Sequence, residues 1–145
     1  MIKIEKRGFG YKINFGGILK QNDINRFKEE LFKYILEKRE DFSIYYDMRS
    51  IRYLSKDAQI ELNNIRKELK LCGSLRSSVV FNRPGDEKQY EFIYFPVDNT
   101  ERVLFASVEF NFEIEGINWL TREIDPNLKI VTRKKNAPDN LLLKS

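Results

Sequence analysis

The stretch FSIYYDMRSIRYLSKDAQIELNNIRKELKLCG, residues 42–73, decides the fold of this chain. Its apolar start predicts a buried strand over residues 42–46, and Ser55 and Gly73 are placed to cap the two ends of a long amphipathic helix. The polar loop expected between them carries Asp47, Arg49, Ser50 and Arg52. Such a strand-loop-helix unit puts polar side chains and free backbone N–H groups at the carboxyl end of a sheet, where open α/β folds place their sites.

Two amphipathic helices are predicted from apolar residues spaced three and four apart. The first covers residues 24–38, with Asn22 or Asp23 as its cap. The second carries its apolar stripe on Ala58, Leu62, Ile65 and Leu69, which places Glu61, Asn64, Arg66 and Lys67 on its exposed side. Cys72, near its end, is expected to be buried.

The remaining segments predict three further strand regions and one closing helix. Residues 1–15 alternate as a hairpin, Gly16 and Gly17 bend the chain, and residues 77–81 and 103–110 form strands. Residues 86–97 suit either a short helix, which we favour, or a strand. A helix over residues 114–120 is interrupted by Gly116, which costs about 1 kcal/mol relative to alanine.

The amino-acid composition limits which classes of protein this chain can belong to. With 145 residues and 41% hydrophobic content, the chain can fill the core of one α/β domain. The absence of histidine removes Ser-His-Asp and Cys-His catalysis, and the single cysteine, Cys72, excludes an intrachain disulfide and a cysteine zinc site. Because no apolar run reaches the roughly 18 residues of a membrane span, we expect a soluble, cytoplasmic protein without cofactor or metal.

Charge is concentrated near the end of the chain. Residues 1–120 carry 20 basic and 19 acidic side chains, whereas residues 121–145 carry six basic and three acidic ones, which is +3 of the net +4. A nearly neutral body argues against a nucleic-acid groove, which needs clustered lysine and arginine. The basic run Arg133, Lys134 and Lys135 is best explained as part of a solvated tail.

The order of these elements resembles the STAS superfamily of anti-sigma factor antagonists and sulfate-transporter tails, and especially small bacterial STAS-like proteins. The resemblance rests on YKINFGGIL (11–19), IYYDMRSIRYLSKDAQ (44–59) and FNFEIEGINWL (110–120). It implies a STAS-like α/β fold with a central mixed sheet of about four to five strands and about four helices packed mainly on one face. Residues 1–124 are assigned to this domain and residues 125–145 to a basic C-terminal tail.

In antagonists of this superfamily, the segment after the central strand reads roughly L-D-x-S-x-V-x-x-I-D-S-S-G, and a partner kinase phosphorylates its last serine. Asp47 matches the aspartate at the strand end, and Ser55 stands where the second aspartate is found. Lys56 replaces the first serine, Asp57 the phosphorylatable serine, and Ala58 the glycine. The acceptor hydroxyl is therefore replaced by a permanent carboxylate, which carries about one negative charge where phosphoserine carries nearly two.

The resemblance implies a non-enzymatic, signalling protein-interaction module whose partner is an anti-sigma factor or a kinase-like regulator. The residues expected to bind the partner are Asp47, Arg49, Ser50, Arg52, Ser55, Lys56 and Asp57. Asp57 would mimic a fixed phosphorylated state, while Ser50 and Ser55 remain candidate phosphate acceptors. The sequence leaves homodimer formation open and predicts neither nucleic-acid binding nor membrane insertion.

Two other functions are weighed against this one. STAS folds are similar in architecture to CRAL-TRIO lipid carriers, so the aromatic segment 90–95 could line a ligand pocket with Tyr45, Tyr46 and Phe105. The simpler alternative is that these rings fill the core or a dimer face. A carboxylate enzyme would require Asp47 and Asp57 to share a pocket. The simpler interpretation treats Asp57 as a helix-start acid and Asp47 as a strand-end residue that bonds to the following segment.

Overall fold

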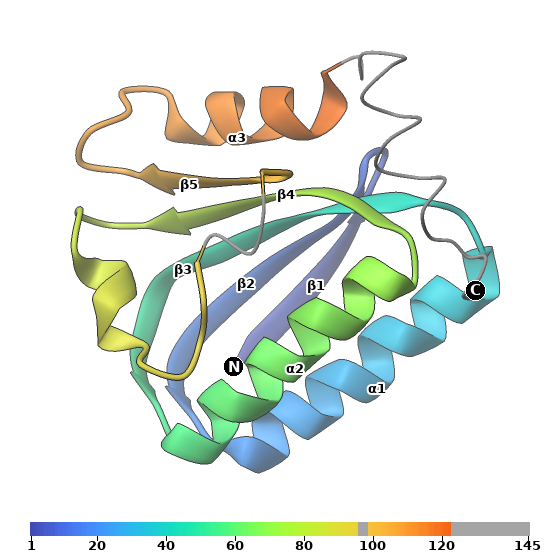
Figure 1. Cartoon of the computed structure of the whole chain (residues 1–145), viewed down its shortest axis with the longest axis horizontal. Helices are drawn as coiled ribbons and strands as arrows, with labels where there is room; N and C mark the ends of the chain where they lie inside the picture. The colour runs from blue at the N-terminus through green and yellow to red at the C-terminus, as the bar shows by residue number, and fades with distance from the viewer. Residues whose placement is uncertain (96–98, 123–145) are drawn as a thin grey trace.

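The computed structural model describes residues 1–95 and 99–122, which form one α/β domain (Figure 1). Its strands are β1 (Ile2–Arg7), β2 (Gly10–Leu19), β3 (Phe42–Leu54), β4 (Ser74–Phe81) and β5 (Glu101–Phe105). Its helices are α1 (Gln21–Lys38), α2 (Lys56–Leu71) and α3 (Phe112–Thr121), with the 3-10 turn η1 at Asp86–Gln89. The predicted tail, residues 125–145, lies outside the described residues.

The five strands form one mixed sheet in the order β1-β2-β3-β4-β5. The β1–β2 hairpin is antiparallel, and every other neighbouring pair is parallel. Helices α1 and α2 cover one face of the sheet, and α3 covers part of the other (Figure 1). The predicted α/β architecture with a central mixed sheet is confirmed, although the described residues contain three α-helices instead of about four.

The main core lies between the sheet and the helices α1 and α2, where alternate residues of β2 and β3 meet the apolar stripes of both helices. A smaller core lies beneath α3 and contains Tyr45, Val80, Leu104 and Leu120. Because side chains alternate along a strand, Tyr45 faces α3 while its neighbour Tyr46 faces α1 and α2. The two faces of the sheet are therefore distinct chemical environments.

Strand β3 is much longer than predicted, and the expected polar loop from Asp47 onward is wrong. The strand continues to Leu54 because β2 also continues, and the two remain paired from Gly10↔Ser43 to Leu19↔Leu54. The predicted bend at the double glycine is likewise replaced by continued strand with shifts of register on either side of it. Gly17 has φ +78°, a conformation that glycine adopts at little cost, so the irregularity is absorbed within the strand.

The helix ends are only partly as predicted. The Ser55 hydroxyl accepts the N–H of Ala58 at 3.2 Å, and Gly73 follows α2 with φ +116°, which confirms both caps. Helix α1, however, begins at Gln21, before either predicted cap. Asp23 lies within its first turn, where its carboxylate accepts the N–H of Lys20 at 2.8 Å.

Four local predictions are wrong. Cys72 is exposed, and Arg66 is 3% exposed, since its guanidinium pairs with the buried Glu101 carboxylate. Residues 86–89 form only a 3-10 turn, and residues 90–95 are irregular, with the rings of Tyr90 and Phe95 packed against Phe81. Strand β5 ends at Phe105, where turns begin and bring the chain back over the sheet as α3.

Candidate functional site

The seven residues predicted to bind a partner are divided by the structure into an inward and an outward group. Asp47 is buried and Arg49 half-buried, and both face α3. Ser50, Arg52, Lys56 and Asp57 are exposed, whereas Ser55 is half-buried as the cap of α2. The structure therefore does not bring all seven side chains to one surface.

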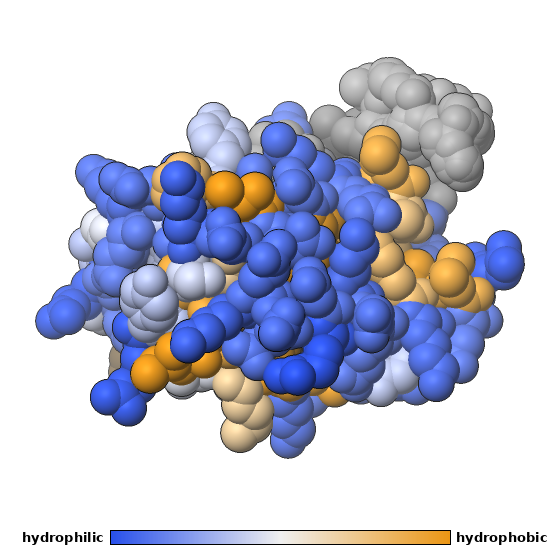
Figure 2. Space-filling model, turned by 90° about the horizontal axis from the view of Figure 1, so that it is seen from below, coloured by the Kyte–Doolittle hydropathy of each residue, from blue (hydrophilic) through white to orange (hydrophobic). Residues whose placement is uncertain are grey.

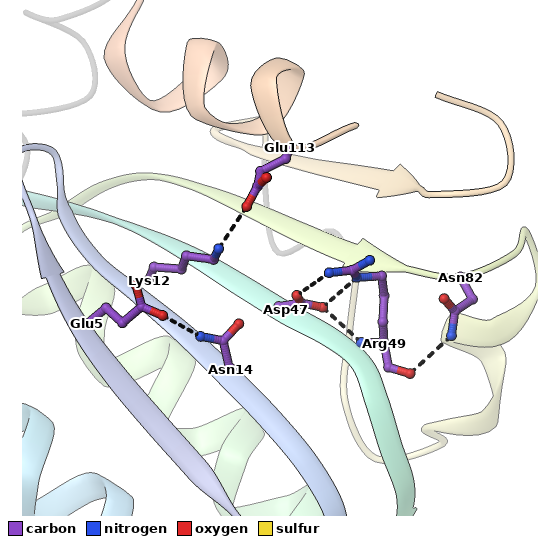
Figure 3. Close-up of polar contacts among 7 residues, drawn as sticks. All are labelled: Glu5, Lys12, Asn14, Asp47, Arg49, Asn82 and Glu113. Atoms are coloured by element: carbon purple, nitrogen blue, oxygen red, sulfur yellow. Dashed lines mark hydrogen bonds and ion pairs between the residues drawn. The ribbon is translucent and has the colours of Figure 1, made fainter. Parts of the chain in front are cut away.

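The Asp47 carboxylate is bound by its strand neighbour Arg49 (Figure 3). The Arg49 Nε and Nη2 donate to its two oxygens at 2.9 and 2.8 Å, and the Arg49 backbone N–H donates at 3.1 Å. This bidentate pairing raises the pKa of Arg49 above its usual value. The guanidinium also lies 4.6 Å from the centre of the Phe112 ring, so the Asp47–Arg49 pair is part of the surface on which α3 packs.

A second polar contact ties β2 to α3 beside that pair. The Lys12 Nζ donates to Glu113 Oε2 at 2.8 Å, and this bond is the main reason why the pKa of Glu113 lies below its usual value (Figure 3). Also on β2, Asn14 donates to the carboxylate of Glu5, on the adjacent strand β1, at 2.9 Å. These contacts are internal to the domain and hold α3 and β1 to β2.

Ser50 lies beside the double glycine of β2. A Cβ atom placed at Gly16 would lie 3.5 Å from the Cβ of Ser50. Both residues line an open depression of about 460 Å³. The other residues that line it are Met1, Lys3, Glu5, Asn14, Phe15 and Gly17. The Ser50 hydroxyl is thus on an accessible part of the sheet that α3 does not cover.

The N-terminus of α2 is joined to the segment that follows η1. Gln59 bridges the two, because its side-chain amide donates to the Leu54 carbonyl at 2.9 Å and accepts the Phe92 N–H at 3.2 Å. The Lys56 ammonium lies 5.2 Å from the centre of the Phe92 ring. This arrangement places an aromatic ring next to the first turn of α2.

Three exposed apolar side chains lie on the segments that meet near this helix terminus. Tyr53 is 55% exposed, Ile60 40% and Phe92 37%. We use the name junction surface for these three residues together with Arg52, Lys56 and Asp57. Seen from the side on which α1 and α2 begin, the molecule is mainly hydrophilic with separate hydrophobic patches (Figure 2).

The sequence reasoning missed the three apolar members of the junction surface. Ile60 could have been found, because it lies outside the apolar stripe of α2 that Ala58 and Leu62 begin. Tyr53 could have been found only if β3 had been extended, since its exposure follows from alternation with the buried Leu54. Phe92 carries no local signal, because its position depends on the contact with Gln59.

The carboxylate pair that an enzyme would require is not assembled. Asp47 lies on the α3 face and both its oxygens are bound by Arg49, whereas Asp57 projects from α2, which packs on the opposite face. Within residues 1–95 and 99–122, no group of acidic or cysteine side chains is arranged to hold a metal ion. None of the helices in these residues is both long enough and apolar enough to span a membrane.

The proposed aromatic ligand pocket is also not formed. Tyr45 and Tyr46 point to opposite faces of the sheet, so they cannot line one cavity. Phe81 instead packs against Tyr90, Phe95 and Phe105, with ring centres 5.3 to 6.2 Å apart. These rings fill the core, as the simpler interpretation of the sequence expected.

The sheet order and the placement of the helices define an α/β domain with a STAS-like fold. The chain is similar to the anti-sigma factor antagonist SpoIIAA in its unphosphorylated form, with a TM-score of 0.59 and 13% identity over 85% of this chain and 100% of that one. It is also similar to an uncharacterised protein of the DUF3478 family with a SpoIIAA-like fold from Shewanella loihica PV-4. That likeness has a TM-score of 0.55 and 14% identity over 83% of this chain and 92% of that one.

Comparison with known protein families gives no match, and comparison with characterised protein sequences gives none either. At 13–14% identity the structural likeness establishes the fold alone. The resemblance to the STAS superfamily is confirmed at that level.

Proposed function

We propose that this protein is a non-catalytic regulatory module of the bacterial cytoplasm that binds a protein partner through the junction surface. The observation that carries the proposal is the exposed Phe92 ring, 5.2 Å from the Lys56 ammonium at the N-terminus of α2, with Asp57 and Ile60 exposed on the same helix. Interfaces of this kind combine apolar or aromatic anchors with a charged rim. The STAS-like fold, shared with an anti-sigma factor antagonist, supports an anti-sigma factor or a kinase-like regulator as the class of partner.

Asp57 is the proposed charged centre of the interface. It is exposed in the first turn of α2 and forms no hydrogen bond or ion pair through its side chain within residues 1–95 and 99–122. A carboxylate there is stabilised by the positive end of the helix dipole and remains available to a basic group of a partner. It would provide permanently the negative charge that phosphorylation supplies reversibly in antagonists.

The proposal is tested by affinity capture from the source cell, followed by calorimetry with the purified partner. Asp57→Arg is expected to weaken binding at least tenfold, because it reverses the charge at the centre of the interface. Glu29→Arg makes the same change on the exposed side of α1 and is expected to leave affinity unchanged. If both variants bind as tightly as the wild type, the junction surface is not the partner site.

Phosphorylation of the module is a separate question with two candidate acceptors. The exposed Ser50 hydroxyl is accessible, whereas the Ser55 hydroxyl already accepts the Ala58 N–H. We therefore propose Ser50 as the better acceptor. Mass spectrometry of the protein isolated from its source cell, with and without a co-expressed kinase, detects the added phosphate. Its absence from both serines would show that the module has no phosphorylation switch at either position.

A further inference from the structure

Strand β1 forms one edge of the sheet (Figure 1). Gly16 N–H donates to the Met1 carbonyl at 2.8 Å, which makes these two residues a hydrogen-bonded pair of the β1–β2 ladder. Because hydrogen-bonded and non-hydrogen-bonded pairs alternate in an antiparallel ladder, residues 3, 5 and 7 also bond to β2. The backbone groups of Ile2, Ile4 and Lys6 therefore point away from β2, and no strand within residues 1–95 and 99–122 pairs with them.

The charge sequence along β1 makes this edge complementary to itself. In an antiparallel pairing with Ile4 opposite Ile4 of a second copy, residues 3 and 5 of the two copies lie directly opposite each other. Lys3 would then face Glu5 of the other copy, twice, across the two-fold axis. The backbone N–H and C=O of Ile4 would form hydrogen bonds with Ile4 of the other copy, and those of Ile2 with Lys6 of the other copy. All the outward backbone groups of these three residues would then be hydrogen-bonded.

The neighbouring registers that also join outward backbone groups are disfavoured by like charges. A shift that centres the pairing on Lys3 places two lysines opposite each other at the axis. A shift that centres it on Glu5 opposes two glutamates and sets Lys3 against Arg7. Of these three registers, only the one centred on Ile4 brings opposite charges together, so the charges of β1 favour it over its two neighbours.

The side chains needed for this pairing are accessible. Lys3 is exposed and forms no ion pair within the described residues. Glu5 is half-buried, accepts a hydrogen bond from Asn14 and lies 3.8 Å from the Arg7 guanidinium, a long contact that a facing lysine can replace. The pairing between β1 and β2 runs without a shift of register, so no bulge twists the edge out of reach. The opposite edge, β5, is less suitable because it is shorter and its Arg102 is held by Glu115 at 3.2 Å.

We propose that two copies of this chain associate through antiparallel pairing of β1 with β1, in the register centred on Ile4, to form a continuous ten-stranded sheet. This inference goes beyond the proposed function, because it concerns a surface other than the junction surface and does not depend on a regulatory partner. A closed two-fold pairing also removes an exposed edge on which further chains would otherwise add.

The test uses the full chain in sedimentation equilibrium over micromolar to submillimolar concentration. A dimer of the 17.3 kDa chain is expected for the wild type. Lys3→Glu and Glu5→Lys each bring like charges together and are expected to weaken dimerisation at least tenfold. Lys67→Glu, an equal change of charge on the exposed side of α2, serves as the matched control and should leave the dimer intact.

The register itself is tested by restoring complementarity. An equimolar mixture of the two single variants is expected to form a heterodimer, and the double variant Lys3→Glu/Glu5→Lys to dimerise as the wild type does. Amide exchange measured by NMR should show protection of the Ile4 N–H that rises with protein concentration. A wild type that stays monomeric throughout, or single variants that dimerise normally, would overturn the proposal.

Discussion

The Tyr45 ring lies against Gly116 of α3 so closely that a Cβ at Gly116 would stand 2.7 Å from Cε2 of Tyr45. The Gly116 carbonyl accepts the Ser78 hydroxyl at 2.8 Å in the same contact, which holds α3 to β4. The sequence alone indicates only that this glycine lowers the helix propensity of its segment. In the fold it permits the close approach that builds the smaller core.

Gly116→Ala is expected to destabilise the protein by about 1–3 kcal/mol, because the buried Tyr45 ring has no room to move away from the added methyl group. This cost exceeds the gain in helix propensity, which is about 1 kcal/mol. Urea unfolding followed by circular dichroism measures the change. Gly8→Ala adds a methyl group with nothing within 4 Å and should be nearly neutral; equal stability of both variants would contradict the packing argument.

Arg66→Met is expected to cost about 3–5 kcal/mol, because the Glu101 carboxylate would lose its buried cationic partner. Lys67→Met, on the exposed neighbouring position, should change stability by less than about 0.5 kcal/mol. Thermal unfolding of both variants compares them. Adding Glu101→Gln to Arg66→Met should cost less than the sum of the two single changes, since the unpaired charge is then removed; strict additivity would show that the pair is not coupled.

Glu113→Gln is expected to lower stability at neutral pH by up to about 1 kcal/mol, since Lys12 loses an ionic partner in a half-exposed pair. The pKa of Glu113 is lower in the folded protein than in the unfolded chain, mainly because of the Lys12 hydrogen bond. Its stabilisation is therefore present above the unfolded-chain pKa and is lost as pH falls through the folded one. Unfolding curves measured from pH 7 to pH 3 should converge for wild type and variant, and a constant difference would argue against the pairing.

Asp47→Asn and Asp57→Arg are expected to separate folding from binding. Asp47 is buried and bound to Arg49, so its change should cost about 1–3 kcal/mol of stability and leave partner affinity intact. Asp57→Arg should leave stability nearly unchanged, because Asp57 is exposed. Urea unfolding measures the stability of each variant, and calorimetry on the same samples measures its affinity for the partner. If folded Asp47→Asn binds the partner more weakly than the wild type, Asp47 is part of the interface.

Local patterns were sufficient wherever a single element carries its own signal. Ser55 and Gly73 mark the ends of α2, and the stripe from Ala58 to Leu69 marks its buried side. Arg66 broke that pattern, because the partner that makes its burial favourable, Glu101, is 35 residues away. The extension of β3 was missed for a similar reason, since its polar residues stay in a strand only because β2 runs beside them.

The sequence by itself determined the α/β class, the order of most elements and the exposed charge of Asp57, because these follow from periodicity and helix caps. Only the tertiary structure separated Asp47 from Asp57, since they lie on opposite sides of the sheet. Tertiary contacts also placed Phe92 beside Lys56 and made Gly116 a point of close packing. Such relationships depend on which distant segments meet, and no local pattern contains that information.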